Sequence, residues 1–262
     1  MNVLDSLRWD LRQALRSLTA RPGHALAVAA TWALGLGATV AVFAVAYGVL
    51  WKPLPYEEPD RLAIVWQTDL HNDSDSERAS APDLRDFQAQ SRSFAGLAGV
   101  TAQPLDLRPP GGEPERVTGA GVAHDLFRIL GVAAALGRGF APEEDRPGAA
   151  GAAVLGHELW RRRFGADPAV LGTTVALDER PYTVVGVMPE GFDFPGDTEL
   201  WVPLEATLGE LGQLRGVHNV LVVGRLGEGV ALAAAGAEMA GIAARLEAAY
   251  PEDIVGRGVR LE

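Results

Sequence analysis

The stretch ALAVAATWALGLGATVAVFAVAYGVL, residues 25–50, governs how the rest of the chain is interpreted, because none of its side chains is charged. A helix rises about 1.5 Å per residue, so this stretch would be about 39 Å long, enough to cross a hydrocarbon core of about 30 Å with some tilt. The stretch therefore predicts a transmembrane helix, for which we set bounds at residues 22 and 52.

Two other interpretations of this stretch fit less well. A buried helix of a soluble protein is one, since many of the residues are alanines, but such helices rarely run this long without a polar face. A cleaved signal peptide is the other, because Ala44, Val45 and Ala46 have the small-x-small form of a cleavage site. The apolar run before that site is longer than the 7–15 residues typical of signal peptides.

The charges on either side of the stretch set its predicted orientation. Basic residues precede it and acidic residues follow it: Arg8, Arg12, Arg16 and Arg21 come before, and Glu57, Glu58 and Asp60 come after Lys52. By the positive-inside rule, the N-terminus lies in the cytoplasm and residues from about 54 onward lie outside. The predicted location is a bacterial inner membrane.

The charge of the two parts of the chain differs in sign. Residues 1–52 carry five basic and two acidic side chains, and residues 53–262 carry eighteen basic and thirty-two acidic ones. An acidic outer part argues against nucleic-acid binding. The chain has no cysteine, which excludes disulfides, thiol chemistry and zinc–thiolate sites.

Residues 1–21 predict a cytoplasmic amphipathic helix that lies against membrane lipid. Apolar residues from Val3 to Leu18 recur at helical spacing, while Arg8, Arg12 and Arg16 fall on another face. An ordinary surface helix is the alternative. The break at Arg21, Pro22 and Gly23 separates this helix from the membrane stretch.

Glycines inside the membrane stretch predict a packing face. Gly35 and Gly37 superficially resemble a phosphate-binding loop, but they follow no strand and no lysine accompanies them. Glycine in a membrane helix more often permits close approach of another helix. We therefore expect Gly35, Gly37 and Gly48 to pack against a second membrane helix.

Past the membrane stretch, strands and helices alternate with hairpins, which is typical of the α+β class. Strands are expected at 61–67, 117–122 and 219–226, a hairpin at 173–188, and an extended piece at 258–261. Helices are expected at 82–93, 124–130, 157–164 and 231–250. Residues 71–77 are predicted to be a polar loop, and residues 94–121 to alternate short apolar pieces with turns.

No catalytic motif is found, so no enzymatic activity, cofactor site or metal site is predicted. The five histidines, at positions 24, 71, 124, 157 and 218, are scattered, and the pair His157 and Glu158 lacks the second histidine of a metalloprotease helix. There is no G-x-S-x-G sequence and no phosphate-binding lysine loop.

An ordered set of short segments is similar to one known family. The set consists of GEPERV at 112–117, DLFRILGV at 125–132, LGRGF at 136–140, PEED at 142–145, LWRRRFG at 159–165, VLG at 170–172, PYTVVGVMP at 181–189 and LWVPL at 200–204. In this order the segments resemble the periplasmic core domain of MacB/FtsX-type ABC transporter permeases. ALGLGA at 33–38 and PLPY at 53–56 resemble that family's first membrane helix and its exit.

The resemblance implies a two-lobed extracytoplasmic domain over residues 53–262. Residues 57–80 and 215–262 would form a membrane-proximal lobe, and residues 81–214 an inserted lobe. It also implies a permease that works as a homo- or heterodimer with a separate cytoplasmic ABC ATPase, whose ATP hydrolysis drives export or actuates a partner across the envelope.

The resemblance also sets a question about length. Members of the family have four membrane helices, three of them after the outer domain, whereas this sequence stops at Glu262. The sequence leaves open whether the chain is a fragment or a complete product, and it does not identify the substrate, the ATPase or the oligomeric state. The alternative function is a single-span envelope protein whose outer domain binds a ligand or partner.

Overall fold

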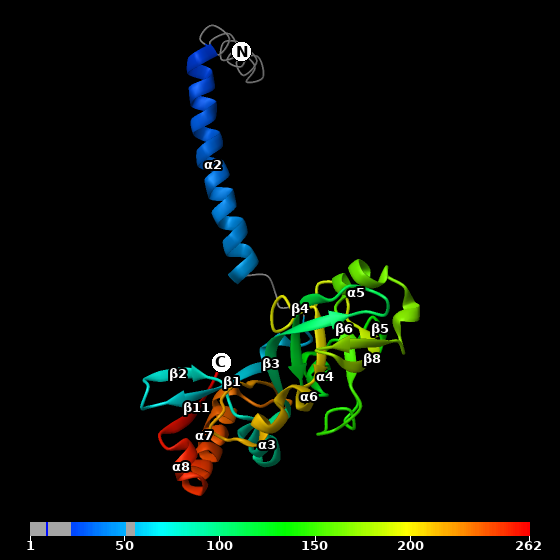
Figure 1. Ribbon diagram of the computed structural model, residues 1–262. Helices are drawn as coiled ribbons and strands as arrows, with labels where there is room; N and C mark the ends of the chain where they lie inside the picture. The colour runs from blue at the N-terminus through cyan, green and yellow to red at the C-terminus, as the bar shows by residue number, and fades with distance from the viewer. Residues whose placement is uncertain (1–8, 10–21, 51–55) are drawn as a thin grey trace. The chain divides into compact units, whose positions relative to one another are not determined.

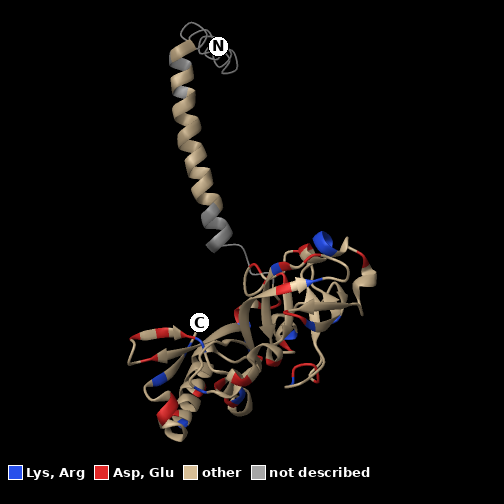
Figure 2. Cartoon of the chain, viewed as in Figure 1, with Lys and Arg blue, Asp and Glu red and all other residues tan. Residues whose placement is uncertain are grey.

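The computed structural model describes residue 9, residues 22–50 and residues 56–262, and the chain divides into two units, Met1–Leu54 and Pro55–Glu262. In the first unit, the uncharged stretch forms helix α2 (Pro22–Leu50), which carries no charged residue (Figures 1 and 2). Its described side chains, such as Trp32 and Leu34, are exposed. The predicted amphipathic helix and residues 51–55 lie outside the described residues, apart from residue 9.

None of the helices in the described residues is both long enough and apolar enough to span a membrane. The membrane crossing remains a prediction from the sequence.

The second unit is built on one mixed sheet. Its strands, as far as the chain is described, follow the order β11-β1-β10-β3-β4-β9-β6-β8-β5, with β2 on β1 and with β7 on β3 and β8. The strands are β1 (Leu62–Asp69), β2 (Ser74–Glu77), β3 (Phe94–Arg108), β4 (Glu115–Val122), β5 (Leu136–Gly137), β6 (Ala152–Leu155), β7 (Thr174–Leu177), β8 (Arg180–Val187), β9 (Leu200–Pro203), β10 (Leu221–Leu226) and β11 (Arg257–Leu261).

Helices connect these strands (Figure 1). They are α3 (Ala81–Gln90), α4 (Leu126–Leu130), α5 (His157–Phe164), α6 (Leu204–Leu208), α7 (Leu232–Ala249), α8 (Pro251–Ile254) and the 3₁₀ turns η1 (Pro59–Arg61), η2 (Pro168–Val170) and η3 (Gly209–Gln213). The mixture of helices and a largely antiparallel sheet confirms the α+β class.

Local sequence signals explain where several predicted helices begin and end. Ser80 caps α3 by accepting a hydrogen bond from the backbone N–H of Asp83 at 3.1 Å. Gly131 ends α4 in the left-handed conformation, with φ at 71°. The predicted hairpin at 173–188 is confirmed as β7 and β8. Helix α3 ends at Gln90, before the predicted end at residue 93.

The largest error in the sequence-based prediction concerns residues 94–121, where short pieces with turns were expected. Residues 94–108 instead form the single fifteen-residue strand β3. Gly99 keeps the strand close to its neighbours, because a Cβ there would lie 2.5 Å from Leu84 and 2.8 Å from Val220. Strand β3 pairs with β10 up to Val100 and with β7 from Leu107, and Pro104 lies between these two paired segments. No described partner strand needs a hydrogen bond from the backbone at Pro104 along this edge of β3, so a proline is tolerated there.

The predicted polar loop at 71–77 is also partly wrong. Residues 74–77 form β2, which pairs with β1 at the edge of the sheet. A polar edge strand has no apolar face to mark it in the sequence, and polar edges protect sheets from pairing with other chains.

Two clusters of buried side chains form the core of the domain. The smaller cluster draws only on residues between 105 and 202, including Leu107, Leu155 and Leu200. The larger one joins residues near both ends of the domain, such as Val65 and Met239, to central residues such as Phe127 and Trp201. Strand β3 contributes to both clusters, and the predicted lobe boundaries at residues 81 and 214 remain a prediction.

Candidate functional site

The lead-in segment, which we define as residues 56–61, begins the described part of the domain after the predicted membrane helix. The Tyr56 ring meets the Phe194 ring edge-on, with 6.2 Å between ring centres. Burial raises the pKa of the Tyr56 hydroxyl, and the charge of Asp193 raises it further. The backbone N–H of Glu57 donates to the Leu130 carbonyl at 3.3 Å, so the segment contacts the end of α4.

Arg225 on β10 ties the lead-in segment to α4. Its Nε donates to the Ile129 carbonyl at 2.6 Å, and its Nη2 donates to the Glu57 carbonyl at 2.6 Å. The Arg225 side chain is 11% exposed, so water competes little for these hydrogen bonds. One guanidinium therefore joins the lead-in segment, the end of α4 and the central sheet.

Arg61 makes a second connection from the lead-in segment to β10. Its Nη2 donates to the Leu226 carbonyl at 3.0 Å and its Nη1 pairs with a carboxylate oxygen of Glu58 at 2.6 Å. Both arginines act mainly on backbone carbonyls, which do not titrate. We call Arg61, Arg225 and their acceptors the lead-in clamp.

Gly131 is required for the close approach of the lead-in segment to α4. A Cβ at this position would lie 2.3 Å from the Cβ of Glu57, and the backbone φ of 71° is one that L side chains rarely adopt. Both the space and the conformation call for glycine here.

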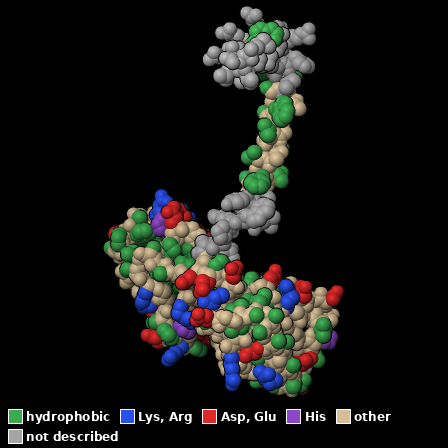
Figure 3. Space-filling view, turned by 180° about the vertical axis from the view of Figure 1, so that it is seen from behind, with side chains coloured by type: hydrophobic (Ala, Val, Ile, Leu, Met, Phe, Trp, Pro, Cys, Tyr) green, Lys and Arg blue, Asp and Glu red, His purple; other side chains and the backbone are tan. Residues whose placement is uncertain are grey.

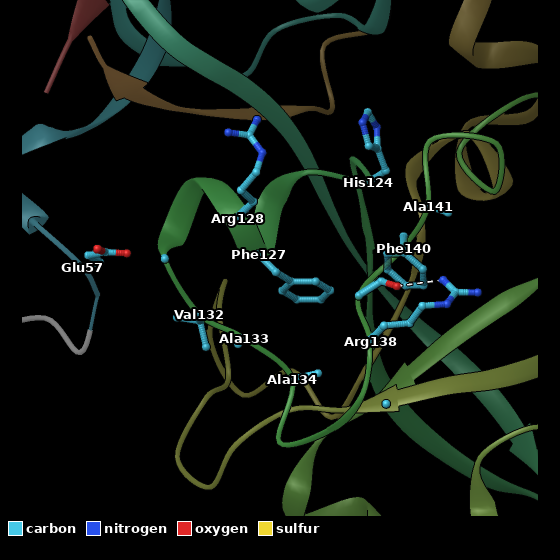
Figure 4. A pocket seen from close by; sticks show the side chains of 13 residues that line it. Glu57, His124, Phe127, Arg128, Val132, Ala133, Ala134, Arg138, Phe140 and Ala141 are labelled. Carbon is cyan, nitrogen blue, oxygen red and sulfur yellow. Dashed lines mark hydrogen bonds between the residues drawn. The ribbon is translucent and has the colours of Figure 1, made fainter. Parts of the chain in front are cut away.

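An open pocket of about 630 Å³ adjoins the lead-in segment (Figure 4). Its apolar lining includes Phe127 and Phe140, whose ring centres are 5.9 Å apart, and Val132. Glu57 borders one side of it. The combination of an aromatic floor and a charged border suits an amphipathic ligand.

Paired charges hold the far border of this pocket. Arg138 donates from both terminal nitrogens to the two carboxylate oxygens of Glu144, at 2.7 and 2.8 Å. This bidentate pairing lowers the pKa of the Glu144 carboxyl. The pairing thereby holds the turn from Ala141 to Glu144 next to Phe140.

A second polar cluster, which we call the crossover network, lies where the chain passes between the two predicted lobes. Asp83 is fully buried at the start of α3 and pairs with Arg215, which also pairs with Asp86 at 2.6 Å. Gln67 on β1 donates to the other Asp83 oxygen at 2.8 Å, and its own oxygen lies 2.8 Å from Nδ1 of His218.

The environment of the crossover network shifts two of its pKa values. Burial alone would lower the pKa of Arg215, but its bonds to Asp86 and Asp83 outweigh burial and raise it. Burial lowers the pKa of His218, whose Nε2 is buried without a hydrogen-bond partner among the described residues. The Tyr250 ring covers Arg215 at 3.9 Å, which adds a cation–π contact.

The glycines predicted to pack in the membrane all lie in α2. A Cβ at Gly35 or Gly37 would meet no other described atom within 4 Å. Packing of Gly35, Gly37 and Gly48 against another helix remains a prediction.

Sequence reasoning missed the arginines of the clamp and of the network. Arg61, Arg215 and Arg225 were not singled out because arginine is abundant throughout the chain. A weak signal existed for Arg225, which interrupts an otherwise apolar strand.

Comparison with known proteins identifies the family. Residues 25–242 match the MacB-like periplasmic core domain. The chain belongs to this family. The predicted resemblance is therefore confirmed, and the family is one of periplasmic domains of ABC-type transporter permeases.

Curated relatives of this MacB-like domain match over part of their length. The macrolide export ATP-binding/permease protein MacB of Burkholderia thailandensis is 34% identical over 112 residues, and that of Burkholderia pseudomallei is 31% identical over 112 residues. In each case the match covers 42% of this chain and 17% of the relative.

Solved structures share the fold of this MacB-like domain. The extracellular domain of the noncanonic ABC-type transporter YknZ has a TM-score of 0.55 at 15% identity, over 76% of this chain and 99% of that one. The periplasmic region of MacB from Actinobacillus actinomycetemcomitans gives 0.57 at 14% identity, over 78% and 92%. A domain of a putative permease from Porphyromonas gingivalis gives 0.59 at 17% identity, over 79% and 92%.

Proposed function

We propose that the chain is a permease subunit, or the N-terminal part of one, of an ABC-type export or mechanotransmission system. In this proposal a cytoplasmic ABC ATPase hydrolyses ATP, and the membrane helices pass the resulting motion to the outer domain. The observation that carries the proposal is the match of residues 25–242 to the MacB-like periplasmic core domain. The lead-in clamp supports the mechanical part, because Arg225 and Arg61 connect the lead-in segment to β10 and α4.

The membrane part of the proposal rests on α2 and on the charges around it. Helix α2 presents exposed apolar side chains along its described length (Figure 3). With the basic N-terminal residues in the cytoplasm, the domain would lie outside the inner membrane. Gly35, Gly37 and Gly48 would contact another membrane helix of the same or a partner permease, in a dimer surrounded by lipid.

Macrolides are the first substrates to test, because the curated relatives are named for macrolide export. The gene, with the ABC ATPase that co-purifies with the tagged chain from its native membranes, is expressed in a macrolide-sensitive bacterial host. We expect the pair to raise the minimum inhibitory concentration of a macrolide. A chain that recovers no ABC ATPase and leaves susceptibility unchanged would overturn the proposal.

Two variants test the mechanical step. A flexible glycine-rich insertion between Trp51 and Pro55 should abolish transport while leaving recovery of the ATPase unchanged. Arg225→Gln should weaken transport in the same way, with Arg260→Gln as a matched control, since Arg260 is 39% exposed and pairs only with surface groups. Unchanged transport by the insertion variant would contradict mechanical coupling.

A single-span envelope protein with a ligand-binding outer domain is the second candidate. The open pocket beside the lead-in segment favours it. Such a protein would bind an amphipathic ligand without any ATPase, and Phe140→Ala would weaken that binding. A macrolide titration of the chain, with and without ATPase, distinguishes the two candidates.

A further inference from the structure

The clearest additional site lies where two parallel strands end side by side. Strands β6 and β8 run parallel, and Leu155 at the end of one is in register with Val187 at the end of the other. His157 and Glu158 begin α5 just after β6, and Glu190 follows β8. The carboxyl ends of neighbouring parallel strands bring residues that are distant in the chain to one edge, where α/β sheets commonly bind ligands.

Backbone hydrogen bonds hold both segments in place at this edge. The N–H of Met188 donates to the Leu155 carbonyl at 2.8 Å, and the N–H of Gly156 donates to the Glu199 carbonyl at 2.7 Å. Phe192 anchors the β8–β9 loop in the core, with its ring centre 5.3 Å from that of Trp201. The side chains that follow β6 and β8 therefore project from a fixed framework.

Three side chains converge there with metal-binding atoms. A ring nitrogen of His157 and one carboxylate oxygen each from Glu158 and Glu190 all lie within 4.8 Å of one another. Nδ1 of His157 is 3.4 Å from a Glu158 oxygen, and the imidazole packs edge-on against Trp160, which limits its rotation. We propose that His157, Glu158 and Glu190 bind a zinc ion, with water completing a tetrahedral site.

The charges around the three residues favour a cation. Glu190 has no ion-pair partner in the described part of the chain, and Glu158 contacts only His157 and the exposed Arg161, at 3.2 Å. The three side chains offer a divalent cation one ligand atom each, all within 4.8 Å of one another. One imidazole with two carboxylates matches the nitrogen and oxygen ligands that zinc accepts.

A hollow of about 510 Å³ beside the site leaves room for water. His157 and Glu158 border this hollow together with Asp193, Asp197 and Glu199. A bound ion would link the start of α5 to the β8–β9 loop. It would thereby add a cross-link between two segments that no covalent bond joins.

Zinc titration of the full 262-residue chain tests the proposal. The chain is stripped with EDTA, desalted into a non-coordinating buffer near neutral pH, and titrated with zinc chloride in a calorimeter. We expect one site per chain that His157→Ala and Glu190→Gln each weaken by about tenfold or more. Zinc should also raise the melting temperature of the unmodified chain and should raise that of the two variants less.

His124→Ala is the matched control, because its imidazole pairs with Asp145 at 3.6 Å in a similar way. Its zinc affinity should equal that of the unmodified chain. Glu190 is exposed, so Glu190→Gln decides the matter should His157→Ala fail to fold, as checked by circular dichroism. No binding at millimolar zinc, or equal binding by the unmodified chain and Glu190→Gln, would overturn the proposed site.

Discussion

The lead-in clamp and the crossover network both use arginine to join distant segments, but they choose different partners. Arg225 donates to the carbonyls of Ile129 and Glu57, whereas Arg215 pairs with the carboxylates of Asp83 and Asp86. Carbonyls have no charge to lose, so the two short hydrogen bonds of Arg225 do not depend on a second ionised group. A buried ion pair fails when either partner is removed, because the remaining charge stays in a poorly solvated place.

The largest effect is expected from Asp83→Ala in the crossover network. The change leaves Arg215 with Asp86 alone and removes the acceptor of Gln67, so we expect the free energy of unfolding to fall by about 3–5 kcal/mol. Urea denaturation measures this loss in the free energy of unfolding. Asp86→Ala serves as the matched control with a smaller loss, since the Asp86 side chain is 29% exposed and that of Asp83 is fully buried. Equal losses for the two variants would contradict the importance of burial.

Gly131→Ala tests how closely the lead-in segment approaches α4. The left-handed backbone costs an alanine roughly 1–2 kcal/mol, and the Cβ clash with Glu57 adds to this, so we expect a total loss of about 2–4 kcal/mol. Thermal unfolding followed by circular dichroism measures the change. Gly165→Ala is the control, because its φ is 64° but its Cβ would meet no described atom within 4 Å. A loss no greater than that of Gly165→Ala would show that the lead-in segment can move away.

Arg225→Met tests the clamp itself. The methionine keeps the apolar part of the side chain but leaves the carbonyl of the fully buried Ile129 without its donor, which costs about 1–3 kcal/mol. We also expect faster hydrogen exchange at the Glu57 amide, which donates to the Leu130 carbonyl. Arg260→Met should change stability by less than about 0.5 kcal/mol. Unchanged exchange at Glu57 would argue against the clamp.

The smallest expected effect is on the pH dependence of stability, which should change with the crossover network and not with the lead-in clamp. Burial and, after it, the charge of Arg257 lower the pKa of His218, while Asp83 and Glu77 oppose them. Because the pKa of His218 is lower in the folded chain, its contribution to stability is fully present above the unfolded pKa of about 6.5 and is lost as the pH falls from there through the lower pKa of the folded chain. Urea unfolding between about pH 7 and about pH 5 should therefore show a shallower decline for His218→Asn than for the unmodified chain. Arg225→Met should keep the unmodified slope.

Sequence patterns predicted most of the regular elements but not the longest strand. Periodic apolar residues and Gly131 marked α4, and Ser80 marked the start of α3. In β3, Gly99 and Pro104 look like breaks in the sequence. The first allows close packing against Leu84, and the second lies at an unpaired stretch of edge, and neither condition is visible before the neighbouring strands are known.

The sequence by itself determined the long uncharged helix, the opposite charge of the two parts, the α+β class and the family, because each depends on residue type and local order. The tertiary structure alone decided which side chains meet. Arg225 reaches Glu57 from far along the chain, Arg215 reaches Asp83, and Glu190 joins His157 only because β6 and β8 end side by side. Strand pairing sets these meetings, and single-sequence periodicity does not encode which strands pair.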